Sequence, residues 1–162
     1  MKPLSVVVRT CCDMFAWFLV VFGVYVIVHG DVTPGGGFQG GAVAATFLAF
    51  LLVAYGGEKT LSWVRPGIYN VLLTVGLLLF LLFGFSGIAN SFFYNFVAVP
   101  HSVAAAGGAH GIIPASGTIA LMDIAVGIEV TGGLSLVLLY MFKGSKMLDT
   151  MKMGGETGHD RR

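Results

Sequence analysis

The segment HGDVTPGGGFQGGAV, residues 29–43, lies between two long apolar stretches and decides how the chain must fold. Glycine and proline disfavour the interior of a helix, so one helix should end before this segment and another should begin inside it. Pro34 suits the first turn of a helix, where its missing N–H is not needed. We therefore expect a turn over residues 30–36 and a new helix from Gly37.

The apolar stretches on both sides of this segment are typical of a membrane protein. Of the 162 residues, 56% are hydrophobic and only 10% are charged, whereas a soluble domain carries about 25% charged residues. Four buried helices of a soluble protein would leave too little polar surface, and the strands of a β-barrel would alternate in polarity. The composition therefore predicts an all-α integral membrane protein with four transmembrane helices. The expected spans are about 10–28, 37–55, 67–88 and 118–142.

The positions of the basic residues predict the orientation of these spans. The connections 30–36 and 89–117 contain no lysine or arginine. All nine basic residues lie before the first span, between the second and third, or after the fourth. The positive-inside rule then places both termini in the cytoplasm and the protein in the plasma membrane. We expect a transmembrane domain over residues 1–143 and a polar, disordered cytoplasmic tail over 144–162.

The long outer connection, residues 89–117, begins with the aromatic run NSFFYNF and continues with small apolar residues. We expect it to lie on the membrane surface or against a neighbouring subunit, because it carries too few charges for a free loop in water. His29 and the other outer-side histidines lack the spacing of a metal site. We interpret them as interfacial polar residues, with ion ligands or proton relays as the alternative.

Other function classes are disfavoured by the composition. The net charge of +1 provides no basic surface for nucleic acid. Gly35, Gly37 and Gly40 match the pattern G-x-G-x-x-G, but a dinucleotide site requires a preceding strand, and here an apolar helix precedes the motif. Cys11 and Cys12 are adjacent, a geometry that rarely forms a structural disulfide. We expect no cofactor bound by this chain, with a sodium ion as a possible ligand.

Small residues recur at every fourth position at the start of the second span. Gly36 and Gly40 stand four apart, as do Gly37 and Gly41, and such rows allow helices to approach backbone to backbone. Gln39 adds a polar group that requires a partner. We predict a surface that packs against partner helices; an ion or anion site at the helix N-terminus is the alternative. The full motif is Pro34, Gly35, Gly36, Gly37, Phe38, Gln39, Gly40 and Gly41.

Three carboxylates inside the spans are candidates for an ion path, because charged groups in hydrocarbon are costly and usually face protein or water. Asp13 stands four residues after Arg9, so it either pairs with that arginine at the interface or belongs to the path. Asp123 and Glu129 lie on the fourth span, about 240° apart around the helix, so they face different neighbours. For Glu129 a proton or cation path and an interhelical hydrogen bond remain equally open.

These residues resemble a known family. The segment HGDVTPGGGFQGG is similar to the H-G-x-x-x-P-G-G-G-F-x-G-G signature of the MnhB/MrpB family, which supplies one of the subunits of Mrp-type sodium/proton antiporters. In the fourth span, LMDIAVGIEV resembles the acidic pattern of that family, with Asp123 at the acidic position and Ala125 where glycine is common. Glu129 is not part of the pattern. The resemblance covers about residues 5–143.

The resemblance implies a small non-catalytic subunit of a large membrane assembly that couples proton movement to sodium export. It implies other membrane subunits of the antiporter module as partners, within the lipid bilayer. Related modules belong to archaeal membrane-bound hydrogenase and sulfur-reducing complexes, and Glu129, Gln39 and the long outer loop favour such an archaeal complex. Two alternatives remain open: a purely structural spacer subunit and a stand-alone small transporter that acts as a homo-oligomer.

Overall fold

A computed structural model of the chain describes residues 5–30, 34–88, 92–95 and 116–159. It confirms the all-α fold, because four of its helices are long and apolar enough to cross a membrane. A short helix, α3, follows the second long helix and was not predicted. The helices are α1 (Val6–Val28), α2 (Gly37–Tyr55), α3 (Gly57–Trp63), α4 (Pro66–Ser86) and α6 (Thr118–His159).

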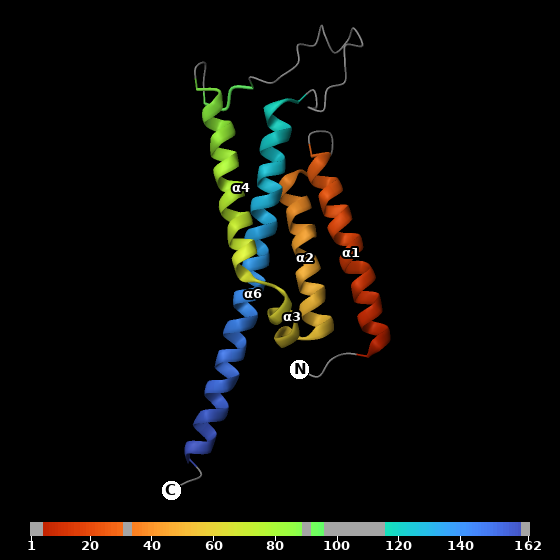
Figure 1. The fold of residues 1–162 in the computed structure, drawn as a ribbon, viewed down its shortest axis with the longest axis vertical. Helices are drawn as coiled ribbons and strands as arrows, with labels where there is room; N and C mark the ends of the chain where they lie inside the picture. The colour runs from red at the N-terminus through yellow and green to blue at the C-terminus, as the bar shows by residue number, and fades with distance from the viewer. Residues whose placement is uncertain (1–4, 31–33, 89–91, 96–115, 160–162) are drawn as a thin grey trace.

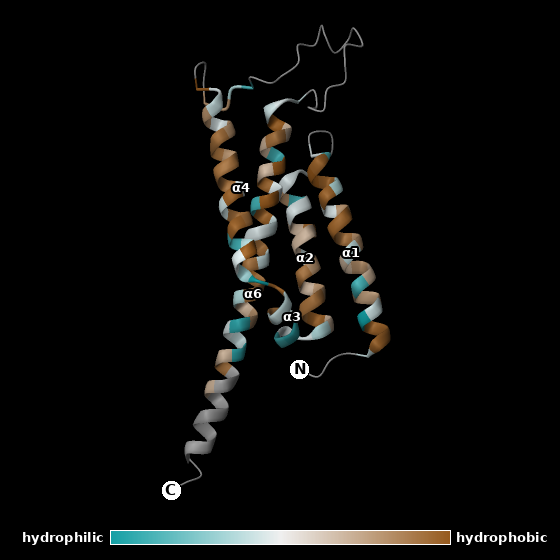
Figure 2. Cartoon of the chain, in the orientation of Figure 1, coloured by the Kyte–Doolittle hydropathy of each residue, from teal (hydrophilic) through white to brown (hydrophobic). Residues whose placement is uncertain are grey.

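The four long helices are arranged so that α2 and α6 form the centre (Figure 1). Helix α2 packs against α1 on one side and α6 on the other, and α6 also packs against α4. Hydrophobic residues predominate along α1 and α4 (Figure 2). Many of their side chains are exposed, including Trp17 and Phe18 of α1, by 66% and 61%. An apolar surface of this size requires lipid or another apolar protein surface as its environment.

Glycines permit the close helix contacts. A Cβ atom on Gly23 of α1 would lie 2.7 Å from the carbonyl oxygen of Gly40 on α2. A Cβ atom on Gly132 of α6 would lie 2.7 Å from the backbone nitrogen of Leu73 on α4. Small residues at such crossings let backbones approach and gain van der Waals contact, which drives helix association in lipid.

The turn between α2 and α3 depends on Gly56, whose φ of 76° lies in the region that side chains with a Cβ rarely adopt. The buried hydroxyl of Thr60 on α3 donates to the carbonyl oxygens of Leu51 and Gly56, at 3.1 and 3.0 Å. These bonds hold α3 against the end of α2. The short helix therefore closes one end of the bundle.

The described parts of the long connection hold the ends of α4 and α6. The side-chain oxygen of Asn95 accepts hydrogen bonds from the backbone N–H and the hydroxyl of Thr118, at 2.9 and 2.6 Å, and thereby caps α6. The backbone N–H of Phe93 donates to the carbonyl of Gly84 on α4. The expectation that this connection lies on the membrane or against a neighbour falls mostly outside the described residues.

Helix α6 extends well beyond the bundle (Figure 1). The sequence led us to expect a disordered tail from Gly144, but the helix continues to His159. This stretch contains no proline, and its lysine, methionine and leucine residues favour helix. Lys146 on this extension forms an ion pair with Glu58 of α3, and the hydrogen bond from Lys146 lowers the pKa of the exposed Glu58 carboxyl.

Candidate functional site

The glycine segment, residues 29–41, meets α6 at Asp123. The first backbone N–H groups of any helix lack partners within the helix. In α2 the N–H of Gly37 donates to Oδ1 of Asp123, at 2.6 Å, across 86 positions of sequence. The N–H of Gly36 donates to Oε1 of Gln39, at 3.1 Å. The partner of Gln39 is therefore the start of its own helix, and a carboxylate of α6 caps the same start.

Only glycines fit around this carboxylate. A Cβ atom on Gly30 would lie 1.6 Å from Oδ2 of Asp123, and one on Gly36 would lie 2.5 Å from Oδ1. A Cβ atom on Gly37 would lie 2.0 Å from the backbone oxygen of Asp123. A side chain at Gly30 or Gly36 would displace the carboxylate, and one at Gly37 would displace the backbone of α6. The run of glycines in the signature thus makes room for an acidic group from another helix.

The two oxygens of the Asp123 carboxylate differ in their surroundings. Oδ1 faces the positive end of the α2 dipole, where a negative charge is stabilised by about 0.3–1 kcal/mol at exposed sites and by about 2 kcal/mol when partly buried. Oδ2 is buried and has no hydrogen-bond partner among the residues that the structure describes. A buried acceptor without a partner costs about 1–3 kcal/mol. The arrangement therefore holds one oxygen in place and leaves the other available to bind a proton or a cation.

Two further glycines of the motif, Gly40 and Gly41, serve helix packing. Gly40 faces α1, where its Cβ position is 2.6 Å from Cγ1 of Ile27. Gly41 faces α6, where its Cβ position is 2.8 Å from the carbonyl oxygen of Gly127. We expected partner helices here, and the helices that approach these glycines belong to this chain. Antiparallel α1 and α2 are joined by a short connection, so each is the other's nearest available partner.

Pro34, Gly35 and Phe38 lie on the outside of the segment. Pro34 and Phe38 are exposed, Phe38 by 61%. A Cβ atom on Gly35 would meet Cβ of Gln39 at 3.5 Å, which is ordinary van der Waals contact. These three residues therefore contribute less to enclosing Asp123 than Gly30, which precedes them.

His29 ends α1 directly before Gly30. Its Nδ1–H donates to the carbonyl oxygen of Tyr25, at 3.0 Å, and the two rings stack with centroids 4.2 Å apart. The structure thus brings His29 to the same end of the bundle as Asp123, on the residue next to the glycine that contacts Oδ2. His29 is thus the C-cap residue of α1, and it makes further interactions in addition to these.

Glu129 faces α4 and not the glycine segment. A Cβ atom on Gly76 of α4 would lie 2.6 Å from the backbone nitrogen of Glu129 and 2.7 Å from its Cβ. The half-buried carboxylate makes no hydrogen bond within the described part of the chain. The helix packed closely against Glu129 is therefore α4. Asp123 and Glu129 therefore occupy different helix interfaces, as their separation around the helix predicted.

Asp13 does not pair with Arg9, which was one of the two alternatives that the sequence left open. Oδ2 of Asp13 accepts a hydrogen bond from the hydroxyl of Tyr55 on α2, at 2.5 Å. The only ion pair among the described residues joins Lys146 and Glu58. The hydroxyl of Tyr55 takes the place of the arginine as the partner of Asp13, because α2 packs against this face of α1. Asp13 lies 17 residues before Gly30, or about 25 Å along the helix, so it is remote from Asp123.

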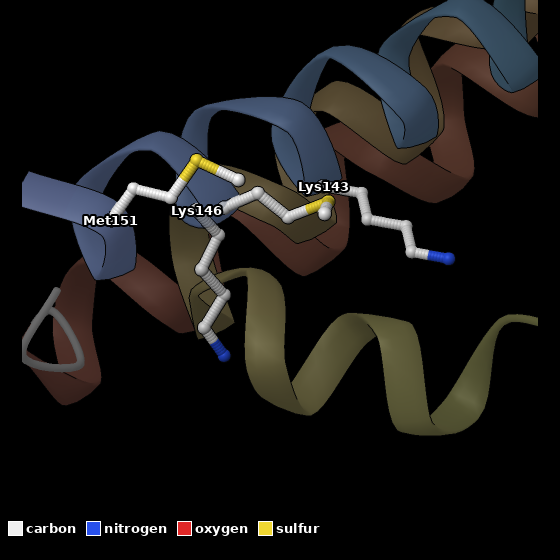
Figure 3. A pocket seen from close by; sticks show the side chains of 4 residues that line it. Lys143, Lys146 and Met151 are labelled. Carbon is white, nitrogen blue, oxygen red and sulfur yellow. The ribbon is translucent and has the colours of Figure 1, made fainter. Parts of the chain in front are cut away.

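An open groove of about 450 Å³ lies along the extension of α6, at the opposite end from Asp123 (Figure 3). It is lined by Lys143, Lys146, Met147 and Met151. The two lysines belong to the end of the bundle that the sequence predicted to be cytoplasmic. The groove shares no residue with the carboxylate site. Among the described residues, no group of three histidine, cysteine or acidic side chains could hold a metal ion.

The four apolar helices and the internal carboxylate define a multi-pass helical membrane protein with a polar site between its spans. Residues 7–136 match the family described as "domain related to MnhB subunit of Na+/H+ antiporter". This match covers most of the chain. The chain therefore belongs to the MnhB family of antiporter subunits, as the signature indicated.

Individual relatives agree with this family. The chain is 34% identical, over 125 residues, to an uncharacterised protein of Methanocaldococcus jannaschii, covering 72% of this chain and 44% of that protein. It is 33% identical, over 78 residues, to a protein of Staphylococcus aureus (strain Newman) named by inference as antiporter subunit mnhB2, covering 48% of this chain and 55% of that protein. The chain thus spans about half the length of these relatives.

A solved structure has the same fold. One chain of the membrane-bound sulfane sulfur reductase, an archaeal respiratory membrane complex, superposes with a TM-score of 0.70 at 26% identity. The match covers 87% of this chain and 59% of that chain. The fold thus occurs in an archaeal respiratory complex as well as in a family related to sodium/proton antiporters.

Proposed function

We propose that this chain is a membrane subunit of an Mrp-type sodium/proton antiporter module within an archaeal respiratory complex, where it contributes to ion translocation and to subunit packing. The observation that supports an ion path is the Asp123 carboxylate, with Oδ1 on the N–H of Gly37 and Oδ2 buried without a partner among the described residues. A carboxylate inside a bundle is retained where it binds a proton or cation or satisfies a polar group. Asp123 can do both.

The family and the archaeal structural neighbour support the choice of module. The family description refers to a Na+/H+ antiporter, and the neighbour is part of a sulfane sulfur reductase complex. Sodium and protons are therefore the ions to test. The chain itself is proposed to be non-catalytic, with neighbouring antiporter subunits as partners and a hydrogenase or sulfur-reducing module as the redox partner. Proteins that co-purify with the tagged chain would distinguish these two modules.

The test of Asp123 separates transport from packing. In Asp123→Asn the amide oxygen can still accept the N–H of Gly37, so we expect the complex to assemble. Sodium-dependent proton movement in vesicles should then fall by about tenfold or more, which corresponds to a barrier raised by about 1.4 kcal/mol. Glu58→Gln, the same change on an exposed carboxylate outside the spans, is the control and should leave exchange unaltered.

The result also decides between the proposal and the structural spacer. Normal exchange in Asp123→Asn, together with lost assembly in Asp123→Ala, would show that the carboxylate is only a helix cap. The chain would then be a spacer subunit without an ion path. Exchange by the purified chain alone in vesicles would favour a stand-alone transporter, and we expect none.

Glu129 is the second carboxylate proposed for the path. Because it lies at the α4–α6 interface and makes no hydrogen bond within the described part of the chain, Glu129→Gln should leave assembly intact. We expect a lower exchange rate or a changed sodium dependence, measured in the same vesicles. Exchange identical to the wild type at all sodium concentrations would remove Glu129 from the path and leave Asp123 as the only carboxylate in it.

A further inference from the structure

Two cations lie over the ring of Tyr55 at the end of the bundle closed by α3. The guanidinium carbon of Arg9, on α1, lies 5.9 Å from the ring centroid of Tyr55. The ammonium nitrogen of Lys59, on α3, lies 5.2 Å from the same centroid and 4.9 Å from that of Trp63. The two rings lie 5.4 Å apart. Three different helices therefore bring two positive charges to one aromatic surface.

Neither cation has a carboxylate partner within the described residues. The nearby Asp13 accepts the hydroxyl of Tyr55, and Glu58 is paired with Lys146. Nε of Arg9 is buried and makes no hydrogen bond with any described residue. No described residue accepts a hydrogen bond from the terminal N–H groups of this guanidinium either, and these accessible groups can donate to an anionic acceptor from outside the chain.

The cluster lies at the ends of the spans, where the lipid headgroups are expected. Arg9 is in the first turn of α1, and Tyr55 is the last residue of α2. Tryptophan and tyrosine are enriched at this boundary between lipid and water, and Trp63 is 58% exposed. The cluster is therefore open to the membrane surface and not enclosed by the bundle.

Deeper in the membrane, the same two helices present an apolar aromatic surface. Arg9, Asp13 and Trp17 stand four residues apart on one face of α1. Trp17 lies against Phe47 of α2, with ring centroids 5.9 Å apart, and remains 66% exposed. One molecule with an anionic head and an apolar chain would match both parts. Arg9, Lys59 and Asp13 together carry one net positive charge, which equals the single negative charge of a phosphodiester.

We propose that Arg9 and Lys59 bind the phosphate of an anionic phospholipid, with Tyr55 and Trp63 beside the headgroup and the acyl chain along Trp17 and Phe47. The phosphate oxygens accept hydrogen bonds from the terminal N–H groups of the Arg9 guanidinium and from the ammonium of Lys59. The lipid thereby fixes α3 and the start of α1 at one depth in the membrane. This proposal does not depend on ion transport by the chain.

The experiment uses the full chain in phosphatidylcholine nanodiscs, with Trp17→Phe so that Trp63 is the remaining tryptophan. Quenching of Trp63 by phosphatidylglycerol brominated near the headgroup is compared with quenching by brominated phosphatidylcholine. A basic residue at the membrane surface contributes about fivefold to the binding of an anionic lipid. We expect stronger quenching by phosphatidylglycerol. The double variant Arg9→Gln with Lys59→Gln should lower the ratio of the affinities for the two lipids at least about tenfold.

Matched variants distinguish a site from general surface charge. Arg65→Gln with Lys143→Gln removes two positive charges from the same end of the bundle, outside the cluster, and should keep most of the preference. Arg9→Lys with Lys59→Arg should also keep it and confirms that the chain still folds. An equal loss in both double glutamine variants would show diffuse attraction only and overturn the proposal. Displacement of the lipid by excess inorganic phosphate would assign the site to free phosphate and overturn the lipid assignment.

Discussion

At the scale of single residues, the site depends on the absence of side chains as much as on the carboxylate. Asp123 fits between α6 and the glycine segment only because Gly30, Gly36 and Gly37 have no Cβ atoms. The carboxylate then replaces the missing intrahelical partner at the start of α2. The signature glycines and the acidic residue are therefore two halves of one arrangement.

Gly30→Ala tests this arrangement. Its methyl group would lie 1.6 Å from Oδ2 of Asp123, so either the carboxylate or the end of α1 must move. Overpacking of this kind costs about 1–3 kcal/mol. We expect a lower thermal unfolding midpoint for the detergent-solubilised protein and reduced exchange in the assembled complex.

Gly35→Ala provides the matched control for that substitution. Its methyl group would meet Cβ of Gln39 at 3.5 Å, so the alanine is accommodated. Equal unfolding midpoints for the Gly30 and Gly35 variants would contradict the close fit around Asp123. A second variant, Gly30→Ala with Asp123→Gly, should recover part of the lost stability, because the clash is then removed.

At the scale of the helices, α2 is the element that holds the others together. It packs against α1 through Gly40 and Gly23, and against α6 through Gly41 and Gly127. The hydroxyl of Thr131 on α6 donates to the carbonyls of Gly127 and Gly41, at 2.7 and 3.3 Å, and so joins the two helices at this crossing. Disrupting either face of α2 should separate neighbours within the chain before it affects contacts with other subunits.

Gly40→Leu is predicted to separate α1 from α2. The first atom of the new side chain would lie 2.6 Å from Cγ1 of Ile27 and 2.7 Å from the carbonyl oxygen of Gly23. The backbone cannot move aside as a flexible side chain can, so we expect this substitution to destabilise the folded protein by about 3 kcal/mol. The amount of folded chain in membranes, and its co-purification with other subunits, should both fall sharply.

The control for this variant is Gly67→Leu, at the start of α4, where the Cβ position has no atom within 4 Å. It makes the same glycine-to-leucine change on an apolar helix, at a position that no other helix approaches. If Gly40→Leu and Gly67→Leu accumulated to the same level, the close approach of α1 and α2 would not matter for folding.

At the scale of the whole molecule, four long helices bring both ends of the chain to one end of the bundle (Figure 1). Lys59 and Lys146 lie at that end too, because α3 and the extension of α6 meet through the Glu58–Lys146 ion pair. Figure 2 shows hydrophilic residues around α3 and hydrophobic residues along the spans. The basic residues that the structure describes on α3 and at the start of the α6 extension are therefore grouped in space as well as in sequence.

The orientation itself is a prediction for this scale. We expect both termini in the cytoplasm, because the connections 30–36 and 89–117 contain no lysine or arginine. Cysteines introduced singly at Ser5 and Ser116, in a background lacking Cys11 and Cys12, should differ in reaction with an impermeant maleimide. In intact cells Ser116→Cys should be labelled and Ser5→Cys should not; the reverse pattern would invert the topology.

Much of the fold could be predicted from the sequence, because in lipid the length and composition of a segment determine whether it spans. The four apolar stretches predicted four long helices, and Pro34 and the glycines marked the break before α2. The partners of individual side chains could not be predicted in this way. Arg9 and Asp13 share a helix face, yet Tyr55 from α2 becomes the partner of Asp13.

What the sequence alone determined is the number of spans, the class of protein and its family signature, since hydrophobic length and local backbone chemistry are properties of contiguous residues. Only the tertiary structure decided that α2 lies between α1 and α6. That order places Asp123 against a helix start 86 positions away in sequence. The physical reason is that helix neighbours in lipid are selected by close fit between surfaces, and such fit depends on residues that no local pattern connects.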